Sequence, residues 1–147
     1  MDNKTAAERS RNMSHIHSRD TKPEITVRKL LFADGFRYRL NVKDLPGKPD
    51  LVLKKYHAVI FINGCFWHGH ANCRYAKTPE TNAEFWTTKI ETNKARDAEV
   101  RRRLLADGWR VLTVWTCSLR NAELLNKTHR RIKAWLLGDT EQAEICG

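Results

Sequence analysis

The chain has no long hydrophobic run, no internal repeat and no low-complexity linker. Its longest uninterrupted apolar run extends from Ala58 to Ile62, whereas a transmembrane helix needs about 20 apolar residues. The sequence after Met1 is polar and lacks the apolar segment of a secretory signal peptide. We therefore expect a cytoplasmic protein with no membrane partner. A length of 147 residues suits one domain with a substantial core.

Acidic residues and cysteines are also few. The sequence has 17 Asp and Glu residues against 27 Lys and Arg residues, which gives a net charge of +10. This charge favours a polyanionic partner, most commonly nucleic acid, although a soluble basic protein without such a partner is the alternative. Four cysteines in a cytoplasmic protein suit metal binding better than disulfides. We assign no role to one of them, Cys146.

The segment 64–73 reads Gly-Cys-Phe-Trp-His-Gly-His-Ala-Asn-Cys. It contains cysteines and histidines, which are common metal ligands, beside two adjacent aromatic residues. Cys65, His70 and Cys73 carry the sulfur and nitrogen atoms that zinc prefers, at spacings that a short loop can fold around one ion. Cys117 follows an expected strand and is the best candidate for the fourth ligand. A closed set of three cysteines and one histidine is structural, because it leaves no position for a substrate. The alternative is a group of reduced cysteines beside an unrelated histidine.

Two other residues in this region suggest a second kind of site. His68 lies two residues before His70, and we expect its ring to point away from the zinc ligands, free for other chemistry. Asp50 begins an expected strand and offers the hard oxygen ligands that magnesium takes. A histidine near a magnesium-bound water can accept its proton, and phosphodiester hydrolysis is the reaction that these groups fit. Taken alone, an aspartate in a turn is usually only a turn residue.

The pattern of elements predicts an α/β protein. Thr21 to Glu24 has capping-box spacing and opens a helix to about residue 34. We expect strands at 36–42, 50–53, 56–62 and 109–115, and further helices at 82–107 and 122–137. This order builds a mixed sheet flanked by helices. The expected organisation is a basic N-terminal arm at 1–20, one domain at 21–138 and a C-terminal tail at 139–147. The arm is either a mobile tail or a segment that orders on DNA.

The helix expected at 82–107 carries one continuous stripe of residues spaced 4, 3, 4, 3 and 4 apart: Trp86, Ile90, Asn93, Asp97, Val100 and Leu104. This spacing places all six on one face. Asn93 and Asp97 interrupt the apolar side, and buried polar groups need partners. They therefore either belong to an internal hydrogen-bond network or face a functional site.

Over roughly residues 9–120 the chain resembles the very short patch repair (Vsr) mismatch endonucleases. The motifs that carry this resemblance are Arg9-Ser10-x-Asn12-Met13-x-x-Ile16, Arg19-Asp20-Thr21-x-x-Glu24, Pro46-Gly47-x-Pro49-Asp50, Val59-Ile60-Phe61-x-x-Gly64-Cys65-Phe66-Trp67-His68-x-His70, Glu84-Phe85-Trp86, Asn93-x-x-Arg96-Asp97, Gly108-Trp109-Arg110-Val111 and Trp115-x-Cys117. The resemblance implies a restriction-endonuclease-like fold with a structural zinc. It also implies magnesium-dependent nicking of one DNA strand beside the thymine of a T:G mismatch, in the repair of deaminated 5-methylcytosine.

The resemblance assigns catalytic roles to four side chains and one carbonyl. Asp50 and the backbone carbonyl of Ile62 would hold one or two magnesium ions. His68 would act as the general base, and Asp97 and Glu24 would assist through hydrogen bonds and bound waters. For Glu24, a role only in the helix cap is the alternative.

The same resemblance assigns contacts with DNA. Phe66, Trp67 and Trp86 would insert between bases from the major groove, and Met13 would reach in from the opposite side. Asn93 would belong to the same DNA-binding surface. A mismatched step costs less to unstack, and stacking on aromatics returns a few kcal/mol. The alternative for the aromatics is core packing.

One departure from the family pattern concerns Ile62 and Asn63, which stand where some relatives have Thr-His. If residue 62 binds metal through its backbone carbonyl, an isoleucine side chain there is acceptable. Asn63 takes the place of a histidine, so a supporting contact with a DNA phosphate is lost. A restriction-type endonuclease without mismatch preference and a non-catalytic, zinc-stabilised DNA-binding module are the alternative functions. We expect a monomer that acts on double-stranded DNA, with mismatch-repair proteins as further partners.

Overall fold

A five-stranded mixed sheet forms the centre of the protein. The computed structural model describes residues 22–147, and the strands follow the spatial order β1 (Arg39–Leu40), β2 (Leu51–Leu53), β3 (Ala58–Asn63), β4 (Arg110–Trp115) and β5 (Gln142–Ile145). Strands β1, β2 and β3 pair antiparallel in succession, whereas β3, β4 and β5 run parallel. Parallel strands end at the same edge of a sheet, so loops that follow β3 and β4 meet there.

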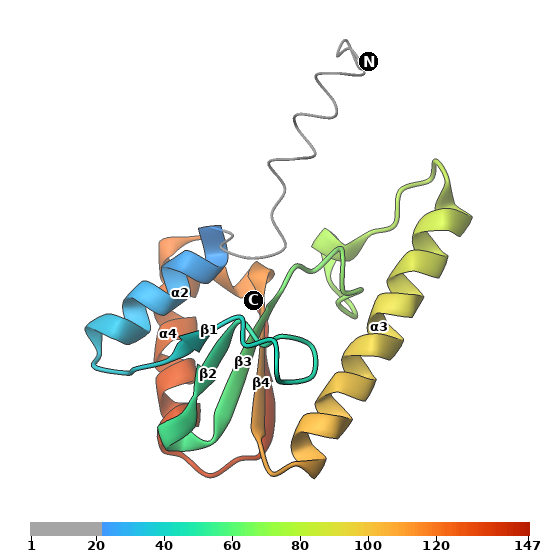
Figure 1. Ribbon diagram of the computed structural model, residues 1–147. Coiled ribbons are helices and arrows are strands. Elements are labelled where there is room, and N and C mark those ends of the chain that lie inside the picture. The colour runs from blue at the N-terminus through green and yellow to red at the C-terminus, as the bar shows by residue number, and fades with distance from the viewer. Residues whose placement is uncertain (1–21) are drawn as a thin grey trace, which may run out of the picture.

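Helices cover both faces of the sheet (Figure 1). Helices α2 (Lys22–Ala33) and α4 (Ala122–Leu137) pack on one face, and α3 (Ala83–Ala106) packs on the other. Alternate strand residues supply the two cores: Leu51 and Leu53 face α2 and α4, whereas Val52 faces α3. This period of two is what a sheet covered on both sides requires. The predicted α/β architecture, with its mixed sheet flanked by helices, is confirmed.

The helices agree closely with the sequence-based boundaries. The stripe on α3 is confirmed: Ile90 and Leu104 are buried and the other four members are half-buried, while most other residues of the helix are exposed. Helix α4 begins after Asn121, whose side-chain carbonyl accepts a hydrogen bond from the backbone N–H of Leu124 at 2.8 Å. The start of α2 at Thr21 and the N-terminal arm, with Met13, lie outside the described residues.

All four expected strands are shorter than predicted, and two of them start two or more residues later. Residues 36–42 form only the two-residue β1, because Asn41 adopts a left-handed conformation (φ 47°) that interrupts the extended backbone. Residues Lys54–Tyr56 form a short 3-10 helix, and His57 (φ 51°) turns the chain into β3. The predicted strand from residue 56 therefore starts two residues later.

The segment at 139–147 was expected to be a tail, but it contains β5. This strand pairs with β4, with Leu112 opposite Ala143 and Val114 opposite Ile145. Ile145 is its one buried residue, so the sequence pattern carries little apolar signal. In the part of the chain from residue 22 onward, no helix is long and apolar enough to cross a membrane.

Candidate active site and metal centre

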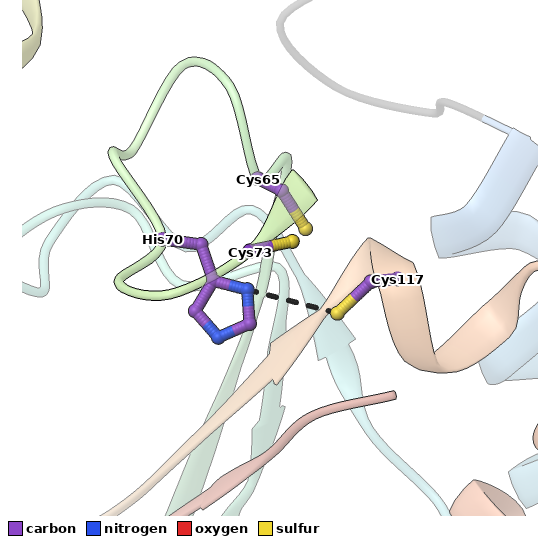
Figure 2. Close-up of side chains that lie close together, drawn as sticks. All are labelled: Cys65, His70, Cys73 and Cys117. Atoms are coloured by element: carbon purple, nitrogen blue, oxygen red, sulfur yellow. Dashed lines mark hydrogen bonds between the residues drawn. The ribbon is translucent and has the colours of Figure 1, made fainter. Parts of the chain in front are cut away.

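Four metal-ligand side chains converge at the ends of β3 and β4. Cys65, His70 and Cys73 lie on the loop after β3, and Cys117 lies in the turn after β4. Their ligand atoms all lie within 4.8 Å of one another (Figure 2). A tetrahedral site with Zn–S bonds of about 2.3 Å places sulfur atoms about 3.8 Å apart, so the four groups fit one ion with little rearrangement.

The surroundings of the cluster favour a bound cation. Burial raises the pKa of the Cys65 thiol to about 11, so a thiolate at this position needs a positive charge beside it. Burial also lowers the pKa of His70, which keeps the ring neutral and able to act as a ligand. Because soft sulfur and imidazole donors dominate, the chemistry of this donor set matches zinc.

Contacts outside the cluster orient its members. The ring of Trp115 stacks on His70, with ring centres 4.1 Å apart and nearly parallel planes. The indole N–H of Trp115 in turn donates to Glu144 on β5 at 3.0 Å. The backbone N–H of Gly147 donates to the sulfur of Cys117 at 3.2 Å. The segment expected to be a tail therefore supports the metal centre.

A separate cavity of about 600 Å³ lies beside the ends of β2 and β3. The sequence-predicted groups Glu24, Asp50, Ile62, His68 and Asp97 all line it. They come from α2, the turn before β2, strand β3, the loop at 64–73 and α3, so folding brings together residues that are far apart in the sequence. The loop at 64–73 is called the metal-binding loop below, because it carries three of the four candidate ligands. The predicted set is thus gathered in one place, although its catalytic roles stay predictions.

The carboxyl group of Asp50 is strongly perturbed by its surroundings. Burial raises the pKa of its carboxyl group to about 7, and nearby Glu24 adds to this effect. The backbone N–H of Ile62 opposes the shift by donating to Asp50 Oδ2 at 2.6 Å. A buried carboxyl group that resists ionisation gains most from a cation placed against it, so Asp50 fits a hard metal ion such as magnesium.

His68 faces away from the metal cluster and into this cavity. Its Nδ1 lies 2.6 Å from Asp97 Oδ2, and Asp97 lies on the half-buried stripe of α3. When Nδ1–H donates to the carboxylate, Nε2 is left as a proton acceptor. His68 and His70 therefore belong to different sites, as expected, but the backbone between them is not extended. The N–H of His68 donates to the carbonyl of Gly64 at 3.1 Å and that of His70 to the carbonyl of Cys65 at 2.9 Å, so turns separate the two rings.

The metal-binding loop is held against α3 by two further contacts. Asn93 donates from its side-chain amide to the backbone carbonyl of Trp67 at 2.9 Å. Gly69 adopts φ +60°, and a Cβ there would lie 2.6 Å from Ile90 and 2.7 Å from Lys94. Only glycine allows this close approach. In the structure, Asn93 thus positions the loop, and contact with DNA remains a prediction for it.

The aromatic residues of the loop and of α3 form one cluster. Phe66, Trp67 and Trp86 contact one another edge to face, with ring centres 5.2 to 5.7 Å apart. Phe85 extends the cluster at 5.0 Å from Trp86 and is 59% exposed. Trp67 is 40% exposed, so core packing does not account for its position.

Sequence reasoning missed the cationic part of the cavity that Asp50 and His68 line. Lys43, Lys48 and Arg96 line it and are exposed. Two signals were available: Lys48 lies inside the Pro-Gly-x-Pro-Asp turn, and Arg96 precedes Asp97. Asn63, which replaces the second histidine of some relatives, also lines the cavity and is buried.

Fold and site together define the class of protein. The structure combines a mixed sheet covered by helices on both faces, a soft-ligand cluster beside a buried carboxylate, and a histidine–aspartate pair. These features define a restriction-endonuclease-like protein.

Comparisons with known proteins identify the family. The family described as DNA mismatch endonuclease Vsr matches residues 1–74. The DNA mismatch endonuclease Vsr of Escherichia coli is 43% identical over 141 residues, which cover 95% of this chain and 90% of the relative. The type II nicking enzyme V.NmeAIP of Neisseria meningitidis is 48% identical over 133 residues, which cover 88% and 94%. The type II nicking enzyme V.XorIIP of Xanthomonas oryzae is 45% identical over 120 residues, which cover 82% and 88%. The chain belongs to the Vsr family and is a DNA endonuclease.

Proposed function

We propose that this endonuclease nicks one strand of duplex DNA beside the thymine of a T:G mismatch, by magnesium-dependent hydrolysis that starts the repair of deaminated 5-methylcytosine. The observation that carries the proposal is the His68–Asp97 pair, which lies in the same cavity as the buried carboxyl group of Asp50. A proton acceptor and a hard-ligand carboxylate in one cavity are the groups that phosphodiester hydrolysis uses.

His68 is the general base in this proposal. Asp97 accepts the Nδ1–H proton, holds the ring in one orientation, and stabilises the imidazolium that forms when Nε2 takes a proton from the attacking water. Magnesium, when bound, stabilises the charge that develops on the phosphate. Asp50, with the main chain of Ile62 beside it, is the proposed ligand, and Glu24 assists through bound water. One chain contributes all these groups, so we propose that it acts as a monomer.

Mismatch recognition is assigned to the aromatic cluster. Phe66, Trp67 and Trp86 already contact one another, so their rings lose little freedom when bases stack on them. A T:G step unstacks more easily than a paired step, and insertion of rings therefore favours the mismatch. Met13, which lies outside the described residues, is proposed to reach the duplex from the opposite side.

The cluster of Cys65, His70, Cys73 and Cys117 is proposed to hold a structural zinc ion. Its function would be to keep one conformation of the loop that presents both His68 and Trp67. Without the ion, the buried sulfur atoms would have no positive charge to compensate a thiolate.

A nicking assay on otherwise identical T:G and T:A duplexes, with and without magnesium, tests the proposal. The expected result is a magnesium-dependent nick on the thymine strand of the T:G duplex that leaves a 5′-phosphate. Asp50→Ala should abolish the nick and retain DNA binding. Equal cutting of both duplexes would instead indicate a restriction-type nuclease, and binding without cutting by the unaltered protein would indicate a DNA-binding module.

A further inference from the structure

A second cavity, of about 490 Å³, lies beside the metal cluster. His70, Cys73 and Cys117 line its inner part, and no residue that lines it also lines the catalytic cavity. The two cavities are therefore separate, and the metal-binding loop contributes to both. Nothing in the proposed catalytic chemistry uses this second cavity.

Two arginines and a tyrosine form the outer part of this cavity. The guanidinium carbon of Arg120 lies 3.6 Å from the ring centre of Tyr75, and that of Arg74 lies 4.9 Å from it. Arg74 also donates from Nη2 to the hydroxyl oxygen of Tyr75 at 2.6 Å. The ring of Tyr75 packs against the cluster of Cys65, Trp115 and Cys117 and is half-buried, so it is a fixed support for both cations.

In the described part of the chain, the two arginines are not paired with acidic side chains. Within residues 22–147, Arg74 and Arg120 take part in no ion pair, and both side chains are exposed. Arg102 on α3 is different, because it contacts Glu99 at 2.5 Å. Two guanidinium groups against one ring repel each other, and an anion between or beside them removes that repulsion. Guanidinium groups held by stacking lose little freedom when they bind, and their planar donors match phosphate oxygens.

We propose that Arg74, Tyr75 and Arg120 form a second DNA-phosphate site, which holds the backbone at a position outside the catalytic cavity. The proposal rests on the assignment of the chain as a DNA endonuclease and is independent of T:G specificity, of magnesium and of His68. The occupant is a backbone phosphate of the duplex. This interaction would add affinity for DNA of any sequence, because phosphate contacts carry no sequence information.

Binding of a fully paired duplex without magnesium, measured across a range of salt concentrations, tests the site. Removing one arginine–phosphate interaction should reduce the slope of log affinity against log salt by about 1. The double variant Arg74→Gln and Arg120→Gln should therefore have a slope smaller by about 2, and Arg120→Gln alone a slope smaller by about 1. Arg120→Lys should recover part of the affinity at low salt, since the charge returns without the planar group.

Arg102→Gln is the matched control, because it removes one arginine charge that is already paired on the surface. It should leave the salt slope unchanged. Equal reductions in Arg102→Gln and Arg120→Gln would show a general charge effect and overturn the proposal, as would an unchanged slope in the double variant. Melting curves and zinc content check each variant. If Arg74→Gln loses metal because it neighbours Cys73, then Arg120→Gln carries the test.

A duplex with single neutral methylphosphonates locates the phosphate that is bound. One substitution outside the nick site should weaken binding of the unaltered protein and have no further effect on the double variant. Titration with inorganic phosphate separates the other source of the same chemistry. The site would belong to free phosphate if two results occurred together. The unaltered protein would bind inorganic phosphate saturably and the double variant would not, while the salt slope for duplex binding was the same in both proteins. That outcome would overturn the DNA assignment. Failure of mismatch-specific nicking would leave all these results intact.

Discussion

His68 and His70 are two residues apart on one loop and belong to chemically different regions. His70 points to three sulfur atoms and stacks on Trp115 in a mostly apolar setting. His68 points into a charged cavity and contacts Asp97. The loop thus separates a soft-ligand cluster, suited to holding structure, from a hard-ligand cavity, suited to acid–base chemistry.

The two regions also differ in how burial acts on their ionisable groups. At the cluster, burial raises the pKa of Cys65 and lowers that of His70, and the proposed metal ion would compensate both effects. In the cavity, burial raises the pKa of Asp50, and only part of this is offset by the N–H of Ile62. Buried groups therefore stabilise the fold in the first region when metal is bound, and oppose folding in the second.

Removing a ligand of the cluster should have the largest effect. Cys117→Ala or His70→Ala should lose zinc and lower the free energy of unfolding by about 4 kcal/mol or more, because structural zinc binding contributes directly to folding. Metal analysis and a melting curve measure this. Cys146→Ala is the control, since Cys146 is exposed and is not part of the cluster, and it should retain both zinc and stability. Zinc retained in Cys117→Ala would contradict the assignment.

Asp50→Asn should stabilise the protein at alkaline pH when magnesium is absent and the Cys65–His70–Cys73–Cys117 cluster is left undisturbed. The pKa of Asp50 is about 7 in the folded state against 3.8 for an ordinary aspartate, so the folded state binds more protons between these values. Stability of the unaltered protein therefore falls as pH rises through this window. The asparagine should gain on the order of 3 kcal/mol at pH 8 and less at pH 5. Urea unfolding at both pH values, with the exposed Asp44→Asn as control, measures the gain; an equal gain at both pH values would refute it.

His68→Ala should reduce nicking without affecting the metal cluster. Loss of a general base lowers the rate by about 10²-fold or more. Zinc content and melting temperature should stay near those of the unaltered protein, because His68 contacts Asp97 and no cluster residue. Parallel measurement on His70→Ala separates the two regions. If His68→Ala lost zinc and His70→Ala kept it, the roles of the two histidines would be reversed.

Trp67→Ala should have the smallest effect, confined to mismatch binding. Loss of one base–aromatic stack costs about 1–3 kcal/mol, so affinity for a T:G duplex should fall while affinity for a T:A duplex changes little. Trp86→Ala should behave in the same way. Fluorescence anisotropy with the two duplexes gives the ratio. A large fall in melting temperature in either variant would assign the ring to the core instead.

Local patterns predicted the elements that carry the site. The stripe on α3 placed Asn93 and Asp97 on one half-buried face, and the structure confirms this. The separation of His68 from His70 was also predicted, but turns in the loop produce it, and an extended backbone would place both rings on the same side. Strand β5 escaped detection because a four-residue edge strand with one buried side chain leaves almost no apolar alternation. Asn41 shortened β1 through a left-handed backbone conformation that neighbouring residues do not signal.

The cations around both cavities could not be found from the sequence for a different reason. Lys48 comes from a turn and Arg96 from α3. They line the same cavity only because both segments pack beside β3. Arg74 and Arg120 stack on the same ring although one follows β3 and the other follows β4. Nothing in the spacing of such residues indicates that they are neighbours.

The sequence by itself determined which residues can act as metal ligands, how they are spaced in the loop, and which residues share one face of α3. Each of these depends only on residues that are close together in the sequence. Only the tertiary structure decided which partners meet. Cys117 reaches His70 across 47 residues, and Asp97 reaches His68 across 29. Parallel pairing of β3 with β4 brings the first pair together, and packing of α3 on the sheet brings the second. Both are long-range contacts that form because the apolar faces of the sheet and helices are buried against one another. The conformational preferences of neighbouring residues do not predict them.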